Sequence, residues 1–215
     1  MITREEYIYY PALSASRIKS HYKGDSYVSQ YALDKGKSFH ERLLEVNPMY
    51  MDAEAKGAYK SITDNGVWYS IWKKSHKEIP FITNLSVEGE VVPAKAMFDI
   101  YSQEYKLMAD VKITQAKNIH DFERDMIEHY NHIQAVWFSK VVGLDPRSFI
   151  FIGMPKSTRL GISRPQDVMF LSLGDHHIEQ ADSLINKYIK TKWKQDKQFI
   201  EQRWQMNQQL SQSSL

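Results

Sequence analysis

The spacing of hydrophobic positions predicts helices in the first third of the chain. Residues 14 to 23 (SASRIKSHYK) favour a short helix with a serine as its N-terminal cap. A second helix is expected from about Gly36 to Val46, because Asn47-Pro48 would end it. Residues 52 to 76 also favour a helix, which Asp64-Asn65-Gly66 interrupts. The N-terminal portion, about residues 1 to 80, is therefore expected to be mostly helical.

The pattern changes at Phe81, where β-branched and aromatic residues become frequent. Alternation and turn signals, among them Glu88-Gly89, predict antiparallel strands at roughly 81–92, 95–101 and 106–113. Side chains two residues apart share one face of a strand. Asp99 would therefore share a face with Lys95, and Asp110 would share a face with Lys112.

Residues 117 to 142 carry the most regular pattern of the chain. Hydrophobic residues recur there every three or four positions, which predicts one amphipathic helix ended by Gly143. They are Ile119, Phe122, Met126, Tyr130, Ile133, Trp137 and Val141. A buried strand (148–154), a further strand (167–173) and a helix opened by Asp175 complete the pattern.

This order of elements predicts an α/β (α+β) domain with a mixed central sheet. A length of 215 residues fits a single domain, expected over residues 1 to 204. The remaining residues, 205 to 215 (QMNQQLSQSSL), are polar and are expected to form a flexible tail.

Composition narrows the chemistry more than the fold. Hydrophobic residues make up 42% and charged residues 25%, as in soluble globular proteins. No apolar run could span a bilayer and the N-terminus does not resemble a secretory signal, so a cytoplasmic location is expected. The chain has no cysteine, which excludes disulfides, thiolate nucleophiles and iron–sulfur clusters. A metal would need carboxylate, imidazole or carbonyl ligands, which favours Mg²⁺ or Mn²⁺.

The charge distribution indicates nucleic acid only weakly. A net charge of +2 is too small to identify a partner. Lysines gather in one late segment, and five Trp and thirteen Tyr could stack on bases. An equally good interpretation is a solvated lysine face with an aromatic core. The lysines are Lys187, Lys190, Lys192, Lys194 and Lys197.

The candidate chemistry lies in the predicted strands, at Asp99 and at Asp110-Val111-Lys112. Two carboxylates on adjacent strands could converge on one Mg²⁺, and Lys112 would project from the face of Asp110. Both acids lie among apolar residues, and a buried carboxylate is costly unless it is paired or binds metal. The alternative is that both acids point to solvent and pair with Lys95 and Lys112.

Four segments, in order, resemble the RecB/RecE-like branch of the PD-(D/E)XK nucleases, in particular phage-type RecE-like exonucleases. The first segment is Tyr10 to Lys19 (YPALSASRIK), and the second is Gly36 to Leu44 (GKSFHERLL). The third, Lys95 to Thr114, resembles the segment that carries the acids and the lysine. The fourth is Tyr130 to Phe138 (YNHIQAVWF). The resemblance implies a restriction-endonuclease-like core and DNA as the partner.

The resemblance also implies roles for single residues. His40, Asp99, Asp110 and the backbone carbonyl of Val111 would be metal ligands, with Lys112 as the catalytic lysine. Gln134 would orient Lys112 or touch DNA, one turn after Tyr130. A further acid often precedes the first Asp in this family; Glu88 and Glu90 are both candidates, and Glu88 is favoured. The chain departs from the family at Phe138, where an aromatic hydroxyl is usual, and around Ala96-Met97, where an Arg or Gly is usual, although Lys95 remains.

The expected function is Mg²⁺- or Mn²⁺-dependent hydrolysis of DNA in phage-type recombination or DNA processing. The family implies a homo-oligomer and a single-strand-annealing partner as further expectations. The alternatives are a repair or CRISPR-adaptation-type nuclease and a DNA-binding module with a degenerate site. His129 and His132 could grip a metal at a spacing of three residues, but a surface position is preferred for both.

Overall fold

A six-stranded mixed sheet forms the centre of the protein, which we describe from a computed structural model over residues 3–24, 38–44, 53–155 and 168–213. The strand order is β1-β3-β4-β5-β6, with β2 on the other edge of β3. The pairs β1–β3 and β4–β5 are parallel, and the other neighbours are antiparallel. The strands are β1 (Leu13–Ser14), β2 (His76–Val87), β3 (Glu90–Ser102), β4 (Leu107–Thr114), β5 (Phe149–Pro155) and β6 (Met169–Ser172).

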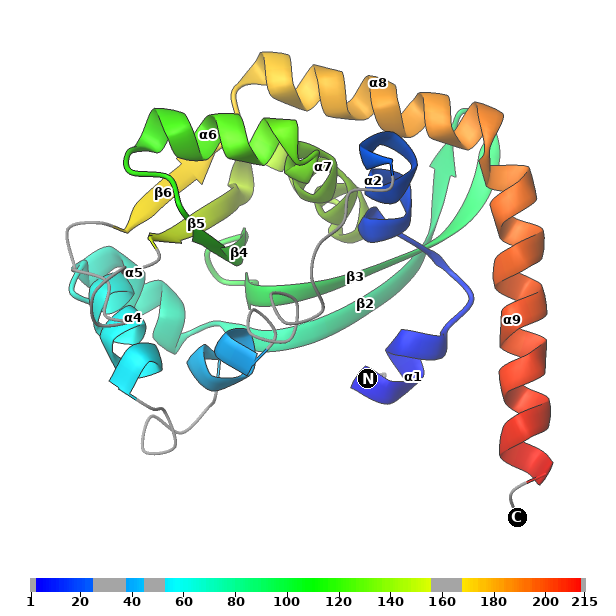
Figure 1. The fold of residues 1–215 in the computed structure, drawn as a ribbon, viewed down its shortest axis with the longest axis horizontal. Helices are drawn as coiled ribbons and strands as arrows, with labels where there is room; N and C mark the ends of the chain where they lie inside the picture. The colour runs from blue at the N-terminus through cyan, green and yellow to red at the C-terminus, as the bar shows by residue number, and fades with distance from the viewer. Residues whose placement is uncertain (1–2, 25–37, 45–52, 156–167, 214–215) are drawn as a thin grey trace.

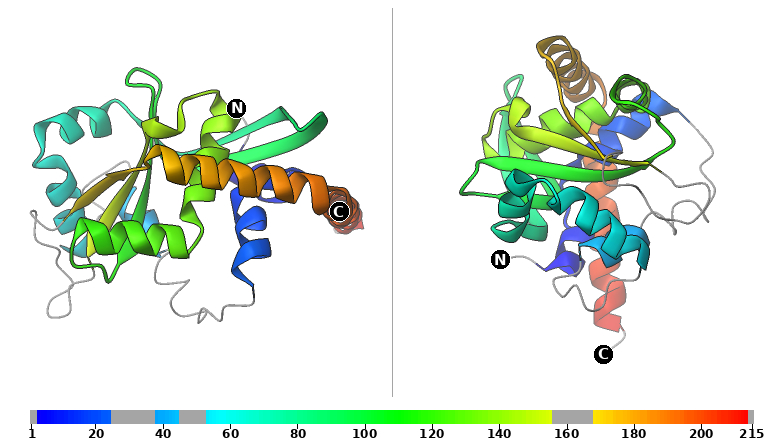
Figure 2. Two further views of the ribbon diagram at one scale, coloured as in Figure 1. Left: turned by 90° about the horizontal axis from the view of Figure 1, so that it is seen from above. Right: turned by 90° about the vertical axis from the view of Figure 1, so that its left-hand side faces the viewer.

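Helices cover both faces of the sheet (Figures 1 and 2). One layer holds α2 (Ala15–Lys23), α6 (Ile119–Glu128), α7 (Asn131–Val142) and α8 (Asp175–Thr191), and its core includes Trp137, Phe149 and Tyr188. The opposite layer holds the helical residues 38–43, α4 (Ala53–Thr63) and α5 (Gly66–Lys73). Its core joins their apolar faces to Ala109 and Val111 of β4. The predicted fold class, a mixed sheet flanked by helices, is confirmed.

Several boundaries differ from the sequence prediction for identifiable reasons. The first strand of the β2–β3 hairpin ends at Val87, because the chain turns at Glu88-Gly89 with left-handed φ angles of 52° and 78°. The predicted strand 81–92 was therefore placed about five residues too late. Strand β1 was not predicted, since two residues are too short for a pattern. A short helix, α1 (Arg4–Tyr9), precedes it.

The single helix predicted over residues 117 to 142 is two helices. α6 ends at Glu128, and Tyr130 adopts a left-handed conformation (φ 55°, ψ 27°) before α7 begins. The hydrophobic spacing continues across this break because both helices pack on the same face of the sheet. Periodicity alone could not reveal the change of direction.

The C-terminal end is helical well beyond the expected limit of the domain. α8 is followed by α9, which runs from Trp193 to Ser213 and includes most of the predicted polar tail. The mobility of this end in solution stays a prediction. No helix among the residues that the structure describes is long and apolar enough to cross a membrane.

Candidate active site

The two predicted carboxylates lie where the hydrogen-bonded pairing of β3 with β4 ends. The last recorded pair is Ile100 with Ala109, and Asp99 and Asp110 are the next residues on the two strands. The pairing of β3 with β2 also omits Asp99, opposite Glu78, which has a φ of 48°. Phe98 belongs to one core and Ile100 to the other, so the strand changes its facing around Asp99. Because of this irregularity, the Asp99 side chain does not follow the regular alternation of β3.

His40 reaches Asp99 from the helical layer on the opposite face to α7. Its Nδ1 lies 3.2 Å from Oδ2 of Asp99, and the same oxygen accepts a 2.8 Å hydrogen bond from the backbone N–H of Val111. The neighbouring Phe39 and Leu43 are buried in that layer and hold the short helix against the sheet. His40 thus contributes to the same site from a helix that lies far before β3 in the sequence.

Asp110, Lys112 and Gln134 form the other half of the site. Lys112 Nζ lies 2.6 Å from Asp110 Oδ2, as the alternation along β4 predicted. Gln134 donates from Nε2 to Asp110 Oδ1 at 2.5 Å and accepts from Lys112 Nζ at 3.3 Å. Gln134 is the one residue between 131 and 139 that is not fully buried, because it faces this cluster. The side-chain exposure of Asp110 is only 7%.

Burial and the charges of neighbouring groups shift the pKa values of Asp99, Asp110 and Lys112. Burial raises the pKa of Asp110, against the opposing effect of Lys112. Burial would also raise the pKa of Asp99, but the hydrogen bond and charge of His40, with Lys112, hold it below its usual range. Burial works against the charged Lys112 as well, yet Asp110 and Asp99 raise its pKa. Perturbed groups of this kind gather at functional sites more often than elsewhere.

A second lysine, Lys19, lies in this region and was not predicted from the sequence. Lys19 of α2 donates a 2.5 Å hydrogen bond to Oδ1 of Asn131, which lies one turn before Gln134 on α7. Burial, followed by the charge of Lys112, lowers the pKa of Lys19 to about 7, although Asp110 opposes this shift. Lys19 ends the first of the four family-like segments, and that position was the only available signal.

Two other predicted positions, Lys95 and Tyr130, face other partners. Lys95 donates to the carbonyl oxygens of Tyr7, Ile8 and Tyr10, at 2.9 to 3.1 Å. The ring of Tyr130 stacks on Tyr22 with centroids 5.8 Å apart. The role of the Val111 carbonyl stays a prediction.

Glu88, the favoured additional acid, is misplaced for that role. It lies in the β2–β3 turn, and nine residues of extended β3 between Glu90 and Asp99 span about 30 Å. Its carboxylate pairs with Lys190 at 2.8 Å, and Glu90 pairs with Lys194 at 3.8 Å. Neither acid can support the site, since the hairpin carries both to its far end.

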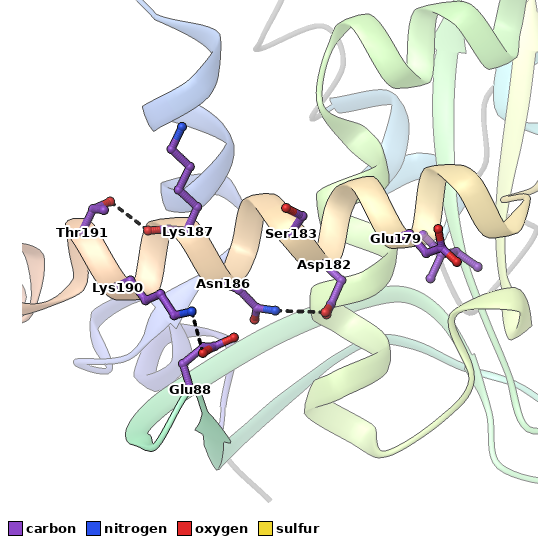
Figure 3. A pocket seen from close by; sticks show the side chains of 9 residues that line it. Glu88, Glu179, Asp182, Ser183, Asn186, Lys187, Lys190 and Thr191 are labelled. Atoms are coloured by element: carbon purple, nitrogen blue, oxygen red, sulfur yellow. Dashed lines mark hydrogen bonds and ion pairs between the residues drawn. The ribbon is translucent and has the colours of Figure 1, made fainter.

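The cavity beside Glu88 has about 660 Å³ and is lined mainly by polar residues of α8 (Figure 3). Its charges are largely compensated: Lys190 pairs with Glu88, and Asp182 pairs with Lys140 at 2.7 Å. Two lysines of the late cluster, Lys190 and Lys194, therefore form surface ion pairs.

The donor set at the site suits a hard divalent cation. Carboxylate oxygens are the ligands that suit Mg²⁺ and Mn²⁺, whereas an imidazole is a more usual ligand of transition-metal ions. Within the described ranges, however, no three His, Asp or Glu side chains stand together as a ready metal site. Asp110 is instead engaged by Lys112 and Gln134, and Asp99 by His40, so a cation would have to exchange with these contacts.

The two histidines considered for metal binding differ in environment. His129 is exposed, as predicted, but the prediction for His132 is wrong: its exposure is 1%. Burial, together with nearby His177, lowers the pKa of His132 to about 4. α7 is enclosed on nearly all sides, which the sequence pattern did not show.

Comparison with known proteins supports the fold. Neither a family model nor a curated protein sequence matches the chain. Among solved structures, a candidate exonuclease from Eubacterium rectale is similar with a TM-score of 0.56 and 14% identity, over 95% of this chain and 87% of that one. LHK-Exo in complex with dAMP aligns with a TM-score of 0.44 and 13% identity, over 97% and 100% of the two chains. The first similarity shows that this chain shares the fold of that exonuclease-like protein.

Proposed function

We propose that the protein is a metal-dependent deoxyribonuclease of the PD-(D/E)XK class. The observation that carries the proposal is the meeting of Asp99, Asp110 and Lys112 at the end of the β3–β4 pairing, with His40 and Gln134 beside them. A structural ion pair would need neither the second carboxylate nor two further polar side chains from separate helices. The shared fold with an exonuclease-like protein supports the same conclusion.

Asp99, Asp110 and His40 would hold the cation, with the Val111 carbonyl as a further ligand. A bound Mg²⁺ or Mn²⁺ lowers the pKa of a coordinated water and neutralises charge on the phosphate. The backbone N–H of Val111 and the β3–β4 junction fix the orientation of Asp99 before any substrate arrives. A preorganised carboxylate avoids the cost of ordering it during the reaction.

Lys112 would orient the attacking water and stabilise negative charge on the phosphate in the transition state. Gln134 positions this lysine, because its amide oxygen accepts from Nζ while its amide nitrogen holds Asp110. Lys19 adds a second positive charge on the α7 side and would contact a phosphate of the bound strand. These groups bind and orient a phosphodiester without supplying a protein nucleophile.

Within this class, the family-like segments favour a RecE-like exonuclease in recombination or DNA processing. A homo-oligomer and a single-strand-annealing partner are part of this more specific proposal. A DNA-binding module of the same fold is the second candidate. It is favoured by one observation, namely that Lys112 and Gln134 already occupy both oxygens of Asp110.

Incubation of the protein with linear and closed circular DNA distinguishes these candidates. Mg²⁺, Mn²⁺ and EDTA are compared, alongside the variants Asp110→Ala and Lys112→Ala. A nuclease of this class degrades DNA with either metal, not in EDTA, and not in either variant. Degradation of linear DNA with sparing of circles would identify an exonuclease. DNA binding without cleavage under any condition would support the binding module instead.

A further inference from the structure

A second cavity, of about 310 Å³, lies between the N-terminal segment and α9. Its walls come from α1, β1, α2, Lys95 of β3 and the middle of α9, and Figure 1 shows α1 and α9 on the same side of the molecule. We call it the α9 groove and define it by Tyr9, Tyr10, Arg17, Lys95, Arg203 and Trp204.

Contacts near the start of α9 hold the wall of the α9 groove in place. Arg17 donates two 2.9 Å hydrogen bonds to Asp196 of α9, and Tyr188 also donates to Asp196. The Arg17 guanidinium lies 5.3 Å from the ring centre of Phe199. These contacts join α9 to α2, so the groove is a defined part of the fold.

Aromatic rings remain accessible in the groove. Tyr9 is 49% exposed, Tyr10 is 38% exposed and Phe199 is 52% exposed. Trp204 lies opposite Tyr10, with ring centres 6.3 Å apart and planes inclined by 52°. Accessible rings of this kind suit planar ligands that stack on their outer faces, as nucleic acid bases do.

The charge of the groove is positive and incompletely compensated. Among the described residues that line it, three are cationic and none is acidic. Asp196 neutralises Arg17, whereas Lys95 donates to three neutral carbonyl oxygens and lies over the ring of Tyr7, 5.0 Å from its centre. Burial and the charge of Arg203 lower the pKa of Lys95 to about 8. An anion bound at Arg203 would stabilise the positive charge of both side chains.

The groove and the candidate active site each include a residue of β3. Lys95 precedes Asp99 by four residues, which is about 13 Å of extended strand. Residues at this even spacing share a face, up to the irregularity at Asp99. A polynucleotide strand with a phosphodiester at Asp99 and Asp110 would therefore reach the α9 groove within a few nucleotides.

We propose that the α9 groove binds a single-stranded polynucleotide that continues from the site of hydrolysis. Its bases stack on Tyr10 and Trp204, and a phosphate pairs with Arg203. The direction of the strand rests on the proposed nuclease function, but binding itself does not. The ligand class follows from the combination of accessible rings and uncompensated cations, which neither a neutral peptide nor an acidic metabolite would use fully.

Fluorescence anisotropy in EDTA tests the proposal without cleavage. The probes are labelled single strands of about 15 and about 3 nucleotides, as DNA and as RNA. Arg203→Gln and Trp204→Ala are each expected to weaken binding of the long strand at least about fivefold, and Trp204→Phe to retain most of it. Arg203→Gln should also reduce the slope of log affinity against log salt by about 0.7. Lys197→Gln, an equal loss of charge on exposed α9 outside the groove, is the control.

Unchanged affinity in both Arg203→Gln and Trp204→Ala, or an equal loss in Lys197→Gln, would overturn the proposal. An equal loss of affinity for the long and the short strand would also overturn the proposal, because only the long strand should reach from the site of hydrolysis to the groove. Thermal melting identifies a Trp204→Ala protein that fails to fold, in which case Arg203→Gln alone decides. Asp110→Asn separates the two proposals: it should bind the long strand normally but not hydrolyse it. If it hydrolyses normally while Arg203→Gln loses binding, the groove stands and the nuclease site falls.

Discussion

The amide nitrogen of Gln134 lies 2.5 Å from Oδ1 of Asp110, and its amide oxygen lies 3.3 Å from Nζ of Lys112. One side chain of α7 thus spans the buried ion pair of β4. A glutamine can do this because it donates and accepts through the same amide group. The same geometry makes α7 responsible for the orientation of both the carboxylate and the lysine.

Gln134→Ala should therefore slow DNA hydrolysis about 10- to 100-fold, since residues that orient ligands have effects of this size. The loss is expected mainly in kcat, because Gln134 positions reacting groups. Gln134→Glu should be at least as impaired, as it places a third carboxylate beside buried Asp110. Gln180→Ala, an exposed glutamine of α8, serves as the control. Equal rates for the Gln134 and Gln180 variants would contradict the positioning role.

Lys19→Ala should weaken DNA binding more than it slows the chemical step. The Lys19 amine lies one helical turn from Gln134 through Asn131, and a phosphate there would stabilise its charge. Removing one phosphate contact should also lower the salt dependence of binding. Binding to a single-stranded oligonucleotide is compared with that of Lys117→Ala, an exposed lysine before α6. A binding constant and salt slope matching those of Lys117→Ala would argue against a phosphate contact.

Gly153→Ala should destabilise the fold by about 1–3 kcal/mol, as overpacked cores do. Gly153 is paired with Lys112 across β4 and β5, and an added Cβ would lie 2.9 Å from ring atoms of Phe122. Phe122 is fully buried. The free energy of unfolding is measured in urea for Gly153→Ala, Phe122→Leu and the double variant. If the ring is the obstacle, the double variant loses less than the sum of the two single losses.

Stability should fall between pH 6.5 and about 4 because of His132. Burial lowers the pKa of His132 to about 4, so the unfolded chain binds its proton more readily in this interval. Stability gained from the neutral imidazole is complete above pH 6.5 and is lost as the pH approaches 4, by up to about 3 kcal/mol. His132→Phe should show a shallower decline in urea unfolding, whereas His129→Gln should behave like the unchanged protein. Parallel pH profiles for all three would contradict the assignment.

The sequence predicted the local features of the site better than its long-range ones. The contact of Asp110 with Lys112 follows from strand alternation. The position of His40 beside Asp99 was implied by the family-like segments. Glu88 was wrongly favoured, because it lies in the β2–β3 turn and is therefore far from Asp99 along β3. The contact between Lys19 and Asn131 joins residues 112 positions apart, and no local pattern encodes such a distance.

The most direct test of the nuclease proposal is the single-turnover rate of DNA hydrolysis with Mn²⁺ for Lys112→Ala. Lys117→Ala, the exposed lysine five residues further along the chain, is measured beside it. Loss of a group that stabilises transition-state charge should lower the rate about 10²- to 10³-fold, and Lys117→Ala should keep the full rate. Both variants should be inactive in EDTA. An unchanged rate for Lys112→Ala, or hydrolysis that persists in EDTA, would contradict the assignment of this site.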